Sequence, residues 1–211
     1  MKLIHKREKI LLLGMGGHSR SCIDVIQSED RFEIAGFVVN DVTNSAINGD
    51  FEILGNDQDL PNLRKRIRHG FVTVGQIQTA STRMALYYSL QSNLFEVPTI
   101  ISPHAYVSPN SIVRDGSIVM HGSVINAGAA IGSNCIINSC ALIEHDSIIG
   151  DHSHISTGAL VNGSVQIKEG SFIGSGAIVN NNIVIGKSCV VSSGHRVDAD
   201  LADGTIYKGL V

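Results

Sequence analysis

The second half of the chain repeats every six residues, and this repeat constrains the fold more than any other feature. From Ile101 to Ala202 the sequence divides into 17 consecutive hexads without a gap. The first position is Ile or Val in all 17 hexads, and the fifth is Ala, Ser or Cys in 13. A strict short period of this kind is the signature of a solenoid, in which coils stack along one axis.

The spacing also predicts the shape of each coil. The fifth position of one hexad and the first of the next are two residues apart, so in a strand they point to the same side. There a large branched residue and a small one fill a narrow interior. We expect the second and third positions at corners, where Gly, Asn and Asp tolerate unusual dihedrals. Three strands and three corners then close an 18-residue triangular coil, a register that an ordinary β-sandwich would not keep.

The first hundred residues lack the repeat and predict an α/β domain that begins with a βαβ unit. The expected strands are Ile10–Leu13, Ile34–Val39 and Phe71–Gly75, and the expected helices are Ser19–Gln27, Leu60–Arg68 and Ser81–Gln91. We expect Ser81 to cap the last helix. The sequence therefore predicts two domains, a Rossmann-like domain over 1–98 and the repeat domain over 99–211.

The turn GMGGHS at 14–19 is a weak match to the dinucleotide fingerprint, because Ser19 stands where a third glycine is expected. It predicts either a phosphate held by backbone N–H groups at a helix N-terminus, with His18 at the mouth, or a tight turn without a ligand. The pair Asn40-Asp41 follows about 20 residues later, the spacing of a group that reaches a ribose hydroxyl.

Bulk composition excludes several classes of protein. The formal net charge is −3, which does not predict a nucleic-acid partner. The four cysteines lack CxxC spacing. The absence of this spacing is typical of free thiols in a reducing compartment. The apolar run Ile10–Leu13 is too short for a signal peptide or a membrane span, so we expect a cytoplasmic protein without membrane insertion.

The stretch INSCALIEHDSIIGDHSH, residues 137–154, gathers acids and histidines that an ordinary strand does not need. The cluster is either a solvated edge or a site of chemistry. With both halves in view, the GxGGH turn, the hexads and the IEHD motif resemble the hexapeptide-repeat sugar acetyltransferases. These include the N-acetyltransferases for nucleotide-linked 4-amino-4,6-dideoxy sugars and the sialic acid O-acetyltransferases. The resemblance implies a left-handed parallel β-helix, acetyl-CoA as cosubstrate, no metal, and a role in bacterial surface-glycan synthesis such as O-antigen.

The resemblance also implies the roles of individual residues. His145 is the expected general base and Asp146 its orienting acid, although Glu144 also flanks the ring. A neutral imidazole suits proton abstraction near pH 7, and a carboxylate on its other nitrogen fixes the tautomer. The residues implied for the cofactor are His154, Gly163, Ser175 and Ser193. The residues implied for the nucleotide sugar are Gly16, Gly17, His18, Asn40, Asp41, Gly75 and Asn138.

In that family the cofactor lies between neighbouring prisms of a homotrimer, and a corner position of His145 fits this arrangement. The family usually ends Y-x-G-x-P-A, whereas this chain stops at IYKGLV. The missing proline leaves the closing loop over the cofactor in question.

Three other functions remain open from the sequence. The first is O-acetylation of a sialic-type sugar. The second is zinc chemistry, which needs three ligands and for which His145, His152 and His154 are available. The third is a nucleotide sensor without catalysis. We expect His152 to face solvent, His104 and His121 to have no role in the chemistry, and His195 to sit at an inward position of the last coil.

Overall fold

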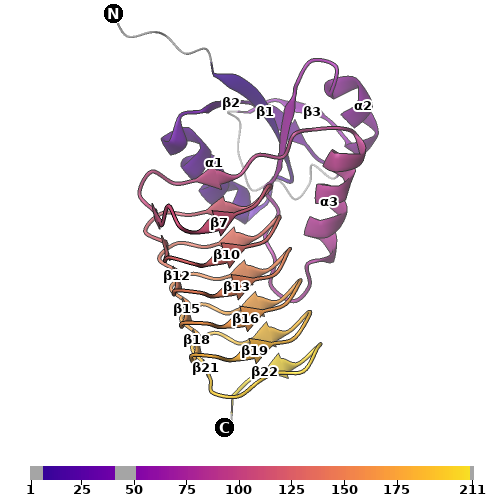
Figure 1. Ribbon diagram of the computed structural model, residues 1–211. Helices are drawn as coiled ribbons and strands as arrows, with labels where there is room; N and C mark the ends of the chain where they lie inside the picture. The colour runs from indigo at the N-terminus through magenta and orange to yellow at the C-terminus, as the bar shows by residue number, and fades with distance from the viewer. Residues whose placement is uncertain (1–6, 41–50, 210–211) are drawn as a thin grey trace, which may run out of the picture.

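The N-terminal domain is a four-stranded parallel sheet in the order β3-β2-β1-β4, set on one end of a long triangular prism (Figure 1). The computed structural model describes residues 7–40 and 51–209, so Asp41 lies outside the described residues. The strands are β1 (Glu8–Leu13), β2 (Phe32–Val38), β3 (Ile53–Gly55) and β4 (His69–Val72). The helices are α1 (Gly17–Glu29), the 3₁₀ helix η1 (Asp57–Asp59), α2 (Leu60–Leu63) and α3 (Ser81–Ser92). The predicted α/β fold is confirmed, with β3 an element that the sequence did not indicate.

Two details of this domain differ from the prediction. The helix expected over Leu60–Arg68 ends at Leu63, and the chain continues in turns that bury Ile67. The prediction that Ser81 caps α3 is wrong. Ala80 holds the cap position, and the backbone N–H of Ser81 donates to the Thr79 hydroxyl at 3.2 Å.

The repeat forms the predicted prism, with three parallel sheets as its faces (Figure 1). The five-strand face holds β7 (Ile112–Val113), β10 (Ala130–Ile131), β13 (Ile148–Ile149), β16 (Gln166–Ile167) and β19 (Val184–Ile185). The six-strand face holds β6 (Tyr106–Val107), β9 (Val124–Ile125), β12 (Leu142–Ile143), β15 (Leu160–Val161), β18 (Ile178–Val179) and β21 (Arg196–Val197). The seven-strand face holds β5 (Ile100–Ile101), β8 (Ile118–Val119), β11 (Ile136–Ile137), β14 (His154–Ile155), β17 (Phe172–Ile173), β20 (Val190–Val191) and β22 (Ile206–Tyr207).

The register confirms the 18-residue coil. Ala130 pairs with Ile148, and the same step relates successive strands of each face. The last coil is shorter, because Val190 pairs with Ile206. The first and fifth positions point inward as predicted, and the free thiols of Cys135 and Cys189 are buried in the same interior. Inward serines bond to the carbonyls of neighbouring coils, as Ser147 does to the carbonyl of Asn162 at 2.8 Å.

The corners lie one residue later in the hexad than expected. The turn occupies the third and fourth positions, and from Gly116 onward the fourth position has a left-handed φ in every hexad up to Gly194. Asp146 with φ 60° and His152 with φ 60° are two examples. Gly, Asn and Asp adopt this conformation most readily, which explains why they recur at the fourth position.

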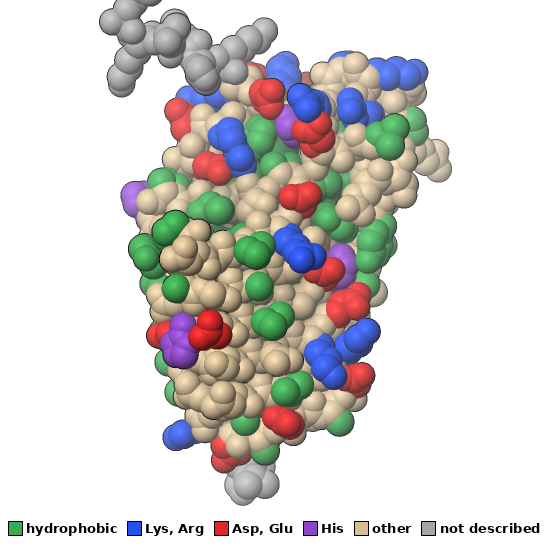
Figure 2. Space-filling model, in the orientation of Figure 1, with side chains coloured by type: hydrophobic (Ala, Val, Ile, Leu, Met, Phe, Trp, Pro, Cys, Tyr) green, Lys and Arg blue, Asp and Glu red, His purple; other side chains and the backbone are tan. Residues whose placement is uncertain are grey.

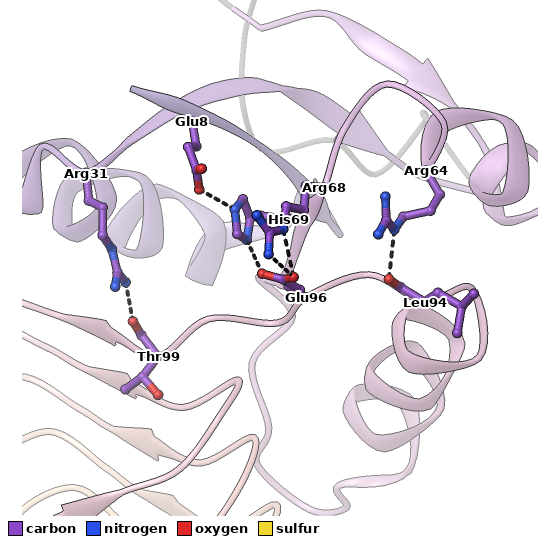
Figure 3. Close-up of polar contacts among 8 residues, drawn as sticks. All are labelled: Glu8, Arg31, Arg64, Arg68, His69, Leu94, Glu96 and Thr99. Carbon is purple, nitrogen blue, oxygen red and sulfur yellow. Dashed lines mark hydrogen bonds and ion pairs between the residues drawn. The ribbon is translucent and has the colours of Figure 1, made fainter. Parts of the chain in front are cut away.

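The linker between domain and prism is fixed by polar contacts, which Figure 3 shows. Glu96 forms a β-bridge with His69 and so extends the sheet beyond β4. Three arginines of the N-terminal domain bind the segment: Arg64 at the carbonyl of Leu94, Arg68 at the carboxylate of Glu96, and Arg31 at the carbonyl of Thr99. These contacts hold the domain in one orientation against the first coils.

The described part of the N-terminal domain covers the seven-strand face and the corners beside it. Ile100, Ile118 and Ile136 of that face belong to the same buried cluster as the domain's own core. The other two faces carry outward apolar side chains, including Tyr106 at 56%, Ile112 at 58% and Ile148 at 49% exposure. Figure 2 shows hydrophobic side chains spaced along the prism, with charged side chains over the N-terminal domain and along the edges of the prism. Within residues 7–40 and 51–209, no helix has the length and apolar character that crossing a membrane requires.

Candidate active site

His145 lies on the corner that joins the six-strand face to the five-strand face, which we call the His145 corner. Its Nδ1 lies 2.9 Å from Oδ2 of Asp146, and the two side chains are 60% and 67% exposed. Glu144 does not reach the ring, because its carboxylate accepts the backbone N–H of His145 at 3.2 Å. The geometry therefore favours Asp146 over Glu144 as the acid that orients the imidazole.

One coil farther along the same corner, Gly163 leaves room for the ring. A Cβ added at Gly163 would lie 2.7 Å from Nε2 of His145, closer than real Cβ contacts allow. The nitrogen that is not paired with Asp146 therefore faces the Gly163 backbone. Among the residues expected to contact the cofactor, Gly163 is thus a neighbour of His145 and not of His154.

A cavity of about 840 Å³ lies between loop 74–79 and the seven-strand face. It brings together five residues that the sequence singled out: His18, Gly75, His154, Ser175 and Ser193. The first two were expected at the sugar and the last three at the cofactor. Gln76, which the sequence did not single out, also lines this cavity and is 4% exposed.

His154 is held in one tautomer. Its Nδ1 lies 2.7 Å from the carbonyl oxygen of Gln76, and its Nε2 lies 3.1 Å from the side-chain amide nitrogen of Asn138. The oxygen of the same amide accepts the N–H of Ser139, so the nitrogen faces the ring. His154 therefore donates through Nδ1–H and accepts at Nε2, as a neutral imidazole.

Burial keeps both histidines of the cavity neutral. Burial, opposed by the bond to Gln76 and reinforced by Arg83, lowers the pKa of His154 to about 4. Burial, then the charge of Arg83, then His154 lower the pKa of His18 to about 3. The two ring centroids are 6.3 Å apart. Neither ring is a strong proton acceptor near pH 7.

A second cavity, of about 430 Å³, lies at the carboxyl ends of β1, β2 and β4 and is lined by Gly16 and Asn40. This edge of a parallel sheet is where nucleotides bind in doubly wound folds. Gly16 caps α1 without a side-chain bond, no acid lies in the first turn, and Cβ atoms at Gly16 and Gly17 would meet open space. The side chain of Asn40 donates to Asp57 at 2.6 Å, a carboxylate in this cavity that the sequence did not reveal.

A single chain does not bring the two halves of the predicted site together. Ser175 and Ser193 lie on the corner between the seven-strand and six-strand faces, beside the larger cavity. His145 lies at the far edge of the six-strand face. The general base predicted from the sequence and the cavity are therefore on different corners of one prism.

The prediction that His152 faces solvent is wrong. His152 is 2% exposed, because α3 packs over its corner. Its Nε2 lies 3.0 Å from the Tyr88 hydroxyl, and its Nδ1 lies 2.8 Å from the side-chain nitrogen of Asn134. This histidine fastens the N-terminal domain to the prism.

His121 also has a structural role. Its Nδ1 lies 2.7 Å from the Ser102 hydroxyl and its Nε2 lies 2.9 Å from Asp24, an order of groups like that of a hydrolytic triad. Ser102 is 1% exposed and its hydroxyl accepts the N–H of His104, so it is not placed to attack a substrate. The set instead ties α1 to the first coils.

In the last coil, His195 is half-buried, with its Nδ1 2.9 Å from the carbonyl oxygen of Ser193.

The three histidines that the sequence offered for zinc lie in three different settings. His145 is on an exposed corner, His152 on a covered corner, and His154 on the seven-strand face. Among the described residues, no group of three His, Cys, Asp or Glu side chains is arranged to hold a metal ion.

The chain is similar to known proteins both in sequence and in fold. Residues 9–87 match the family described as the PglD N-terminal domain. The acetyltransferase domain of PglB from Neisseria gonorrhoeae, in complex with acetyl coenzyme A, is 27% identical with a TM-score of 0.83, over 94% of this chain and 95% of that chain. PerB from Caulobacter crescentus, in complex with CoA and GDP-perosamine, is 30% identical with a TM-score of 0.85, over 92% of this chain and 91% of that chain. No curated protein sequence matched the chain. The fold and these similarities together show that the chain belongs to the hexapeptide-repeat sugar acetyltransferases and is an acetyltransferase.

Proposed function

We propose that this acetyltransferase moves the acetyl group of acetyl-CoA to the 4-amino group of a nucleotide-linked 4-amino-4,6-dideoxy sugar, for bacterial surface-glycan synthesis. The observation that carries the proposal is the larger cavity, which joins His18 and Gly75 to His154, Ser175 and Ser193. The ligands of the two similar structures, acetyl-CoA in one and CoA with GDP-perosamine in the other, support it.

His145 is the proposed general base, chosen among the three histidines by environment. His18 and His154 have pKa values lowered to about 3 and about 4, so they are neutral near pH 7 but weak proton acceptors. His145 is exposed, and Asp146 orients it. The amine nitrogen attacks the thioester carbonyl carbon, Nε2 of His145 takes the proton that the nitrogen then sheds, and the carbon–sulfur bond breaks to release CoA. Asp146 stabilises the imidazolium that forms, and a covalent acyl-enzyme is not needed.

The remaining residues bind the two substrates in this proposal. Ser175, Ser193 and His154 contact the acyl carrier, and the N–H of Gly163 holds the acetyl oxygen as its charge develops. The open N-terminus of α1, from Gly16, takes the phosphates of the nucleotide. The paired side chains of Asn40 and Asp57 face the ribose in the smaller cavity.

A homotrimer completes the proposed site. The six-strand face separates His145 from the cavity within one chain, so a neighbouring copy would have to supply the base. The two faces beside the His145 corner carry Tyr106, Ile112 and Ile148 outward, and these side chains are exposed in the part of the chain that the structure describes. Burying such side chains between copies is favourable, at about 25 cal/mol per Å² of apolar surface.

Two experiments test the proposal. The first incubates the protein with acetyl-CoA and a panel of acceptors: UDP-, dTDP- and GDP-linked 4-amino-4,6-dideoxy sugars and a sialic acid. We expect thiol release with at least one amino sugar nucleotide. Release only with the sialic acid would replace N-acetylation by O-acetylation.

The second experiment mixes two inactive variants under conditions in which the copies exchange. His145→Ala lacks the base, and His154→Ala lacks a contact in the cavity. If the site is shared between copies, random mixing restores up to about a quarter of the full activity, because some interfaces then hold both intact halves. Mixtures as inactive as the separate variants, in a protein shown to exchange, would contradict the shared site.

A further inference from the structure

Arg83 is a cation buried at the seam between the N-terminal domain and the prism, and it has no role in the proposed acetyl transfer. Its side chain is 1% exposed. The guanidinium donates to four backbone carbonyls: Val72 at 3.0 Å, Val74 at 2.9 Å, Asn134 at 3.2 Å and Gly116 at 3.4 Å. Two of these lie at the end of β4 beside the larger cavity, and two lie on a corner of the prism.

The charge of Arg83 has no carboxylate to balance it among the residues that the structure describes. The ionisable groups that act on it are the thiols of Cys22 and Cys135. Burial raises the pKa of each thiol to about 12, so both are neutral near pH 7. Burial lowers the pKa of Arg83 to about 10, so the guanidinium stays charged. The four carbonyl oxygens solvate the guanidinium but do not neutralise it, so its charge acts on the ionisable groups around it.

The charge of Arg83 acts on three histidines, and two of them line the cavity. Arg83 lowers the pKa of His18 and of His154, in each case after the larger effect of burial. Burial lowers the pKa of His152, Asp151 and Glu169 oppose that shift, and Arg83 adds a smaller effect in the direction of burial. For His18 the other titratable neighbour is His154. The guanidinium donates to the carbonyl of Val74, a residue that lines the cavity, so a positive charge lies directly behind the cavity wall although the rings that line it are neutral.

We propose that Arg83 is a positioning residue whose unpaired charge keeps the cavity electropositive, so that the acceptor's amino group binds there as the free amine. The proposal rests on the proposed function, in which an amine is acetylated in this cavity. An ammonium group has no lone pair and cannot attack a thioester. A positive potential disfavours the ammonium form as it disfavours the imidazolium forms of His18 and His154. The first proton leaves to solvent on binding, and His145 takes the second one after attack.

The alternative is that Arg83 only brackets the two domains through its four carbonyl contacts. In that case the loss of its charge changes stability but leaves the titration of the nearby histidines as it was. Measuring those titrations separates the two roles, and it needs no knowledge of the substrate.

The first test is an NMR titration of the histidine rings in the ligand-free protein, for wild type and Arg83→Gln. Gln keeps amide donors for the carbonyls but removes the charge. We expect the pKa of His18 and of His154 to rise by roughly one unit, the scale on which a single charge acts inside a protein. Tyr88→Phe is the matched control, because it removes a bond across the same seam without changing charge, and it should leave both values in place.

A folded Arg83→Gln protein with unchanged titration of His18 and His154 overturns the proposal, whatever the acceptor proves to be. If Arg83→Gln does not fold, the unmodified enzyme decides. ¹⁵N-labelled GDP-perosamine, or the amino sugar nucleotide that reacts fastest in the acceptor panel, is titrated free and bound. We expect a lower amine pKa in the complex, and an equal or higher value contradicts the proposal. A failure of every amino sugar to react contradicts the proposed function instead.

Discussion

Two histidines on neighbouring corners of the same prism have opposite surroundings. His145 is 60% exposed and pairs with the adjacent Asp146. His152, one hexad later, is 2% exposed and is held by Tyr88 and Asn134. Both lie within residues 137–154, and both occupy turns between strands of the prism. The difference arises because α3 covers one corner, whereas none of the residues that the structure describes covers the other.

Whole faces of the prism differ in the same way as these two corners. On the covered seven-strand face, histidines are buried and neutral, and they bind or position groups through hydrogen bonds. On the uncovered His145 corner, the imidazole is exposed to solvent water, which can supply and remove protons. The repeat decides where a side chain emerges, and the element packed above it decides what that side chain can do.

The largest expected effect is on stability against pH, and it comes from the covered face. His18 and His154 have folded pKa values of about 3 and about 4, below the 6.5 of the unfolded chain. A lowered histidine pKa leaves stability complete above the unfolded value and removes it as pH falls toward the folded value. Between pH 7 and pH 5 we expect a loss of about 2 kcal/mol for each histidine, or about 4 kcal/mol together.

Denaturant unfolding at pH 7, 6 and 5 measures this loss. The double variant His18→Asn, His154→Gln should flatten the dependence, because its side chains at these positions do not titrate. A wild-type protein equally stable at pH 5 and pH 7 would show that the covered histidines are not buried as neutral rings.

The next effect is on activity, at the uncovered corner. His145→Gln should lower kcat by about a hundredfold, equivalent to about 2.7 kcal/mol, because a general base is lost. Its melting temperature should stay within about one degree of wild type, because the side chain is largely in solvent. Steady-state kinetics with acetyl-CoA and calorimetry check both halves. A variant with full activity would move the base elsewhere.

His152→Ala should do the reverse. We expect it to destabilise the protein by about 2 kcal/mol, since it leaves the buried amide of Asn134 without its partner, removes the bond to the hydroxyl of the half-exposed Tyr88 and opens a cavity under α3. Its kcat should stay within about twofold of wild type at a temperature where it is folded. The same two assays, run beside His145→Gln, test whether the two corners differ as described. A His152→Ala protein of wild-type stability would remove the contrast.

The smallest effect concerns the acid beside the base. Asp146→Asn should lower kcat about tenfold, equivalent to about 1.4 kcal/mol, because the ring loses the carboxylate that stabilises its protonated form. Glu144→Gln is the matched control, since Glu144 contacts backbone and not the ring. A larger loss for Glu144→Gln than for Asp146→Asn would reverse the assignment of the orienting acid. Both are measured as kcat at saturating acetyl-CoA.

Much of the molecule could be predicted from the sequence. The hexads predicted the inward positions and the 18-residue coil, because each coil repeats one local pattern against its neighbours. The alternation of strand and helix in the first hundred residues predicted the α/β domain in the same way. The error in the corner position, fourth and not second, came from reading turns by composition, whereas the left-handed residue is defined by backbone geometry.

The sequence by itself determined the prism, the α/β domain and the corner that carries His145 and Asp146, because these follow from periodic and local patterns. The burial of His152, the positions of Gln76 and Asp57 in the cavity walls, and the position of Arg83 between the domains became visible in the folded structure alone. These facts depend on how a domain without a repeat docks on one face of a repeating prism. That docking joins residues 33 to 97 positions apart, and its contacts recur with no period that a single sequence could reveal.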